Sequence, residues 1–153
     1  TGIVFNEVVI RHAGDHESRV ILRRFALFGG SLLSIMTIFF AIAPFAQFWF
    51  QDIEGLDSEM LHLAQRAVWM MIPGPLFAFL ASYWQGLLVN AHQTRPISEG
   101  VAVGLGITTI ALIVLAFLDV MPGAIGASLA MSLGQGTQCL WLWIRVRSLV
   151  PQS

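Results

Sequence analysis

The sequence contains no lysine and a single cysteine, Cys139, and only 11% of its 153 residues are charged. One cysteine cannot form an internal disulfide and cannot build a thiolate metal site. Without lysine, the chain also lacks the glycine-rich loop ending in lysine that binds nucleotide phosphates. The formal net charge of −1 leaves no basic excess for nucleic acid, so we predict no nucleic-acid partner.

Apolar residues take the place of the missing charges. Hydrophobic residues make up 56% of the chain, which has 11 Phe and 5 Trp. A soluble domain has about 25% charged residues, and disordered chains are rich in charge and poor in aromatic residues. The composition therefore excludes a soluble monomer and a disordered chain, and it predicts an integral membrane protein.

Four stretches of the sequence are long and apolar enough to cross a membrane. A helix needs about 20 predominantly apolar residues to cross about 30 Å of hydrocarbon. The stretches that meet this condition are residues 25–50, 67–89, 97–118 and 124–144. Lipid offers the backbone no hydrogen-bond partner, and the strands of a β-barrel alternate over about ten residues, so these spans must be helices. We predict an all-α, polytopic membrane bundle.

The spans divide the chain into three parts. The prediction is a cytoplasmic juxtamembrane segment at 1–24, a four-helix transmembrane bundle at 25–147 and a cytoplasmic tail at 148–153. Pro73 and Pro75 remove backbone donors, so we expect the second span to bend or break near its outer third.

The arginines predict the orientation of the spans. Seven of the eight lie outside the spans on one side of the membrane: Arg11, Arg19, Arg23, Arg24, Arg95, Arg145 and Arg147. The positive-inside rule places that side, and both termini, in the cytoplasm, so we predict a plasma-membrane or inner-membrane protein. The opposite side carries Arg66 and five carboxylates, those of Asp52, Glu54, Asp57, Glu59 and Asp119.

Glycine spacing in the last two spans is typical of close helix packing. The glycines concerned are Gly100, Gly104, Gly123, Gly126 and Gly134. Small residues four positions apart lie on one helix face and let two backbones approach each other in lipid. We interpret the spacing as tight packing of the third span on the fourth, or alternatively as the face of a homodimer.

Polar residues inside spans are candidates for a substrate path. Ser128, Ser132 and Gln135 lie at positions i, i+4 and i+7 and therefore share one face of the fourth span. Gln85, near the inner end of the second span, is a further candidate. Each of these residues either bonds a neighbouring helix or lines a substrate path.

Arg66 is a basic residue on the side where basic residues are disfavoured. Its position at the start of the second span makes it a candidate for contacting an anionic ligand in an outward-facing vestibule. The alternatives are an ion pair with Glu59 or Asp57 and an interaction with lipid phosphate.

The titratable residues give little support for catalysis. No Asp or Glu lies in the middle of a span, so the sequence has no evident proton relay or sodium-binding carboxylate. His12 and His16 are four residues apart, but the segment lacks the Glu of a zinc-protease helix. His62 and His92 fall at span ends. We predict no enzyme activity, no catalytic residue, no metal and no cofactor.

Two segments resemble the carboxy-terminal part of transporters of the multidrug/oligosaccharidyl-lipid/polysaccharide exporter superfamily. They are YWQGLLVNAHQTRPISEG at 83–100 and GAIGASLAMSLGQGTQCLWLWIRVRS at 123–148. In multidrug and toxic compound extrusion members, a Gln-Gly step precedes a loop rich in Gly, Thr and Arg, and the last helix carries Gly-x-x-Gly and then Gly and Gln. The similar residues here are Gln85 and Gly86, Thr94 and Arg95, Gly123 and Gly126, and Gly134 and Gln135.

One departure from that pattern points to a particular branch. Residues 89–92 are VNAH where the multidrug exporters usually have Arg-Gly, and the loop TRPISEG is more similar to the progressive ankylosis branch. Members of that branch are associated with the export of organic anions and nucleotides.

The resemblance covers about residues 23–147 and implies that the spans are helices nine to twelve of a twelve-helix, two-lobe transporter. The chain, which begins with Thr1, would then be a fragment whose partners are membrane lipid and the missing amino-terminal lobe of the same chain. The implied function is alternating-access export of an organic anion or drug. The alternatives are a lipid-linked oligosaccharide flippase of the same superfamily and a four-helix membrane scaffold subunit.

Overall fold

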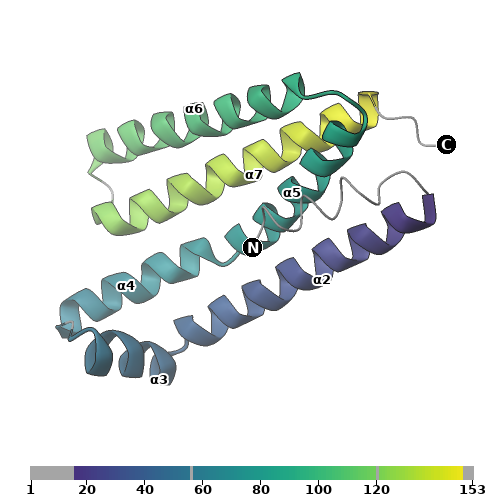
Figure 1. Cartoon of the computed structure of the whole chain (residues 1–153). Coiled ribbons are helices and arrows are strands. Elements are labelled where there is room, and N and C mark those ends of the chain that lie inside the picture. The colour runs from purple at the N-terminus through teal and green to yellow at the C-terminus, as the bar shows by residue number, and fades with distance from the viewer. Residues whose placement is uncertain (1–15, 56, 120, 150–153) are drawn as a thin grey trace.

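The structure is a computed structural model that describes residues 16–55, 57–119 and 121–149, with only the backbone at 16–19 and 43. Within these ranges every regular element is a helix, as the sequence predicts. The elements are α2 (His16–Ala41), α3 (Ala43–Ala46), the π-helix η1 (Gln47–Ile53), α4 (Ser58–Met71), α5 (Gly74–Asn90), α6 (Arg95–Leu118) and α7 (Gly123–Leu149). They follow one another across Figure 1 in the spatial order α6, α7, α4 with α5, and α2.

Three helical segments of the described chain are long and apolar enough to cross a membrane. They are Val20–Ala41, Ser58–Asn90 and Arg95–Leu118. The structure therefore agrees with membrane association. The predicted fourth span corresponds to α7, which has 27 residues but is not among the three. Polar side chains lower its hydropathy, and α7 packs against α4, α5 and α6, so its polar face has protein neighbours.

The first predicted span, 25–50, is not one helix in the structure. α2 begins earlier, at His16, and ends at Ala41, after which α3 and η1 continue the chain. Pro44 contributes to the break because it has no backbone N–H to donate to the preceding turn. Gln65 of α4 donates from Nε2 to the backbone oxygen of Ala41 at 3.2 Å, which satisfies a carbonyl at the end of α2.

The second predicted span is broken at its prolines. α4 ends at Met71 and α5 begins at Gly74, with Pro73 between them and Pro75 in the first turn of α5. The break divides Ser58–Asn90 near its middle rather than at the outer third, because α4 begins nine residues before the predicted start at 67. Figure 1 shows α4 and α5 as two separate rods.

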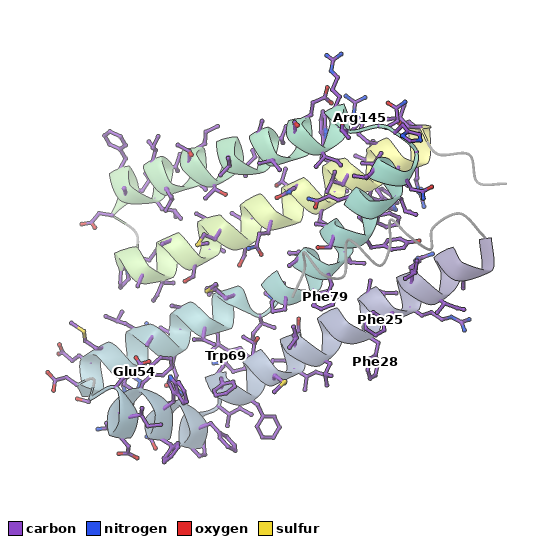
Figure 2. The ribbon with its side chains drawn as sticks, viewed as in Figure 1. Phe25, Phe28, Glu54, Trp69, Phe79 and Arg145 are labelled. Carbon is purple, nitrogen blue, oxygen red and sulfur yellow. The ribbon has the colours of Figure 1, made fainter. Side chains whose placement is uncertain are left out.

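The buried core lies where α2, α5 and α7 meet. Its buried residues are Leu22, Ala26, Phe79, Tyr83, Leu87, Leu88, Leu142 and Val146. Figure 2 shows Phe79 of α5 on the side of that helix that faces α2. α6 lies on the other side of α7 and contributes little to this core, so it must be held in a different way.

The two ends of the bundle carry opposite charge. The end formed by the start of α2, the α5–α6 loop and the end of α7 carries the described arginines Arg23, Arg24, Arg95, Arg145 and Arg147. The other end carries five carboxylates, those of Asp52, Glu54, Asp57, Glu59 and Asp119. Glu54 and Arg145 mark the two ends in Figure 2. The charge difference used to predict the orientation is therefore present along the long axis of the fold.

Candidate functional site

Ser132 of α7 contacts the break between α4 and α5. Its Oγ donates to the backbone oxygen of Met70, in the last turn of α4, at 2.6 Å, and the residue is only 9% exposed. A helix break leaves carbonyls without a donor from the next turn. Non-helical backbone at membrane depth is tolerated where protein or a water-filled cavity satisfies these groups. Ser132 supplies such a donor.

Gln135 lies one turn further along α7, against the other side of the same break. A Cβ built at Gly74, the first residue of α5, would lie 3.1 Å from Gln135 Oε1. Glycine at position 74 therefore leaves space for the amide. The Gln135 side chain is half-buried and forms no side-chain hydrogen bond with any residue that the structure describes. Its carbonyl and amino groups remain available to a ligand.

The third member of the predicted polar face has a different role. Ser128 is buried, but its Oγ donates to the backbone oxygen of Ala124 at 2.9 Å, within α7 itself. This bond satisfies the hydroxyl locally. Of the three aligned residues, Ser132 and Gln135 meet the helix break and Ser128 does not.

Gln85 and Arg66 are not part of this cluster. Gln85 is half-buried on α5, eleven residues after Gly74, which corresponds to about 16 Å along the helix. Arg66 is exposed on α4 and forms no ion pair within the described part of the chain, so the alternative of an ion pair with Glu59 or Asp57 is not seen there.

Two of the predicted packing glycines bring the backbones of α6 and α7 together. A Cβ built at Gly104 would lie 3.0 Å from the backbone oxygen of Gly134. A Cβ at Gly134 would lie 2.7 Å from the backbone oxygen of Gly104 and would overlap the side chain of Thr108. Neither position has space for a larger residue.

The other three predicted glycines differ from one another. A Cβ at Gly100 would lie 3.3 Å from the ring of Trp141, which is a tight contact, and one at Gly126 would lie 3.6 Å from Leu115, which is an ordinary one. Gly123 is exposed at the start of α7, and an added Cβ would meet nothing within 4 Å. Gly123 is therefore not a packing position in this structure.

The structure also reveals a close contact that the sequence analysis missed. A Cβ at Gly29 of α2 would lie 3.0 Å from the ring of Phe79, and one at Gly30 would lie 3.0 Å from the Cα of Leu76. The adjacent glycines within an apolar span were the available signal. They let α5 approach α2 at the core.

A charge cluster that the sequence analysis also missed joins α6 to α7 at the arginine-rich end. Glu99 accepts from Arg95 Nε at 3.0 Å and from Arg145 Nη2 at 2.7 Å. The Arg145 guanidinium lies over the ring of Trp141, 5.0 Å from its centre. Arg145 and Glu99 are 46 residues apart, so no local sequence pattern indicates the pair.

The described residues provide no evident metal site. Among them, no group of three or more His, Cys, Asp or Glu side chains lies close enough to hold a metal ion. His12 and the side chain of His16 lie outside the described residues. The arrangement of Ser132 and Gln135 suits hydrogen bonding to a ligand or to another helix.

Comparison with known proteins gives no match to a family model, to a curated protein or to a solved structure. The class that the fold and the site define is an all-α protein with membrane-length apolar helices, one of them broken at proline beside a polar helix face.

Proposed function

We propose that the chain forms part of a secondary active transporter that exports a small molecule by alternating access. The observation that carries the proposal is the Gln135 amide beside the α4–α5 break, which forms no side-chain hydrogen bond with any described residue. In many transporters, substrates bind near the bilayer midplane where a membrane helix is discontinuous. Irregular backbone and a polar side chain then offer donors and acceptors within the membrane.

In this proposal α7 is the fourth membrane span. Its 27 residues correspond to about 40 Å, longer than the about 30 Å of the hydrocarbon core, and its sequence is uncharged from Gly123 to Ile144. Contacts with α4, α5 and α6 support a central position in which polar groups need not face lipid. Both termini lie in the cytoplasm, on the side of the plasma or inner membrane that holds the arginine-rich end.

The sequence resemblance supports the wider arrangement. The segments at 83–100 and 123–148 are similar to the end of exporter chains, so the four spans form part of the second lobe of a twelve-helix protein. The loop TRPISEG favours an organic anion over a cationic drug as substrate. Binding partners are membrane lipid and the first lobe.

The membrane orientation is tested by labelling single cysteines in a Cys139→Ser background. We expect an impermeant thiol reagent to label a cysteine at position 54 in intact cells, and to spare cysteines at positions 14 and 148 until the cells are permeabilised. Labelling of 14 or 148 in intact cells would contradict the orientation, whatever the substrate.

The role of Gln135 is tested by transport assays on the intact protein at matched surface expression. We expect Gln135→Leu to lose transport, because the amide beside the break is removed. Gln138→Leu serves as a matched control, since Gln138 lies against Gly104 of α6 and not against the break. Equal, intact transport in both variants would contradict a substrate path at Gln135. It would leave Ser132 and Gln135 as helix-packing groups of a scaffold.

A further inference from the structure

A groove of about 380 Å³ lies on the surface between α2 and α7, with α5 as its floor. Most of its length is apolar, and these lining residues are Leu27, Phe77, Leu80, Gly136 and Leu140. One end of the groove is different, because Arg23, Trp84 and Trp143 line it.

The change from polar to apolar lining follows the helix axes. Gly136 lies seven residues before Trp143 on α7, and Phe77 lies seven residues before Trp84 on α5, which is about 10 Å in each case. The arginine-rich end of the bundle is at the mouth of the groove. A phospholipid changes in the same order, from a charged phosphate at the membrane surface to hydrocarbon below it.

The lining of the groove contains few polar atoms. Trp84 and Cys139 both belong to it. An indole has a single polar group, its N–H, so most of the Trp84 surface is apolar. The rings and methylene groups around it present an apolar surface suited to an acyl chain.

The mouth of the groove carries positive charge that the described carboxylates do not neutralise. Arg23 and Arg147 are exposed and form no ion pair with any side chain that the structure describes. Glu99, at the same end, is engaged by Arg95 and Arg145. The unpaired arginines are therefore available for a ligand, and basic residues at a membrane surface attract anionic lipid headgroups.

Arg147 is held beside the groove by an aromatic contact. Its guanidinium lies over the ring of Trp143, 4.0 Å from the ring centre. Trp143 lines the groove at the end that also contains Arg23, so this stacking places a second cation at the same end. An arginine guanidinium suits a phosphate because its N–H groups match two phosphate oxygens.

We propose that this groove binds one anionic phospholipid. Its phosphate lies at Arg23 and Arg147, and one acyl chain lies along Leu27, Leu80 and Leu140. Charge selects an anionic headgroup over a zwitterionic one, and the apolar floor requires an attached acyl chain. The site is separate from the Ser132–Gln135 cluster and does not depend on the transport proposal.

The test uses the intact protein in neutral detergent, titrated with phosphatidylglycerol or with phosphatidylcholine of the same acyl chains. Native mass spectrometry counts the lipids retained. We expect tighter retention of phosphatidylglycerol, and we expect Arg23→Gln to weaken it about fivefold. Arg24→Gln removes the same charge from the same helix but outside the groove, and we expect it to weaken retention less than twofold. Equal retention of the two lipids, or equal effects of the two variants, would overturn the proposal.

A second variant tests the apolar part of the groove. Leu140 is 53% exposed, so Leu140→Trp fills the groove without disturbing the core, which circular dichroism and thermal melting verify. We expect it to remove the tightly retained phosphatidylglycerol. If retention is unchanged and inorganic phosphate competes for the site, the groove binds phosphate alone, and the lipid assignment is overturned. If the variant instead changes the oligomeric mass, the groove is an interface between copies, and the proposal is also overturned.

Discussion

Two helix pairs on opposite sides of the bundle use glycine in different ways. In the α6–α7 pair, Gly104 and Gly134 face each other, and the atoms nearest an added Cβ include backbone oxygens. In the α2–α5 pair, Gly29 faces the aromatic ring of Phe79. Both pairs are closely packed, but their closest contacts differ. The α2–α5 pair has one backbone contact, in which a Cβ at Gly30 would lie 3.0 Å from the Cα of Leu76, whereas a Cβ at Gly134 would lie only 2.7 Å from the backbone oxygen of Gly104.

The two helix pairs differ in how easily the atoms nearest the glycine can move. Lipid tails are as apolar as leucine, so helix association in a membrane depends on van der Waals packing and interhelical hydrogen bonds more than on removal of apolar surface from water. A ring can shift by a few tenths of an ångström when a neighbour grows, whereas a backbone oxygen moves only with its helix. The α6–α7 pair should therefore tolerate added volume less well than the α2–α5 pair.

The largest expected effect is that of Gly134→Ala. The new Cβ would lie 2.7 Å from the backbone oxygen of Gly104 and overlap Thr108, so the two helices must separate. We expect the free energy of unfolding to fall by about 3 kcal/mol, which is at the upper end of the cost of overpacking a core. Thermal unfolding in detergent and steric trapping in bicelles measure it.

Gly106→Ala is the matched control for this prediction. Gly106 is on α6, is exposed, and has nothing within 4 Å of an added Cβ. We expect no loss of stability there, since alanine is the better helix former by about 1 kcal/mol. A stability change of equal size in the two variants would show that α6 and α7 are not packed through Gly134.

The next effect is that of Phe79→Ala in the α2–α5 pair. Phe79 is 8% exposed, so truncation leaves a cavity beside Gly29. We expect the free energy of unfolding to fall by about 2 kcal/mol. This is less than the about 3–5 kcal/mol typical of a soluble core, because moving an aromatic side chain from lipid into the protein contributes little free energy. Phe28→Ala, at a ring that is 69% exposed on α2, should change the same unfolding midpoint very little. If both truncations are neutral, α2 is not held by this ring.

Much of the fold follows from patterns that the sequence displays directly. Long apolar runs predict the helices, and Pro73 with Pro75 predicts the break in the second span. Glycines four residues apart mark the α6–α7 contact, although the same pattern includes the exposed Gly123. The end of α2 at Ala41 is harder to read, because the apolar run continues to position 50 and the signal for a break, Pro44, lies three residues beyond the end of the helix.

The contacts that define the candidate site are harder to read from sequence. The shared face of Ser132 and Gln135 is predictable from helix periodicity, but the partner of Ser132 is the backbone oxygen of Met70, which no residue type signals. Gly29 becomes a packing position only when α5 places Phe79 against it. Such pairings depend on how helices far apart in the chain meet.

The smallest expected effect concerns the hydrogen bond between α7 and α4, the helix that precedes α5. Ser132 of α7 donates to Met70 of α4, so Ser132→Ala removes a polar contact between the half that contains α6 and the half that contains α2. Interhelical hydrogen bonds in membrane proteins contribute about 0.6 kcal/mol on average, with about 1.7 kcal/mol at most. We expect Ser132→Ala to lower the free energy of unfolding by about 1 kcal/mol, since the bond is short and satisfies a carbonyl at a helix break.

Ser128→Ala is the control, because its hydroxyl bonds only within α7 and its removal should cost less than Ser132→Ala in the same unfolding assay. A double variant with Gly134→Ala then asks whether the polar contact and the glycine contact act independently. The residues are two positions apart on α7, and a rigid helix transmits a displacement from one contact to the other. We therefore expect the combined loss to be smaller than the sum, because separating α7 from its neighbours weakens the Ser132 bond before the serine is removed. Strict additivity would show instead that the two halves of the bundle respond separately.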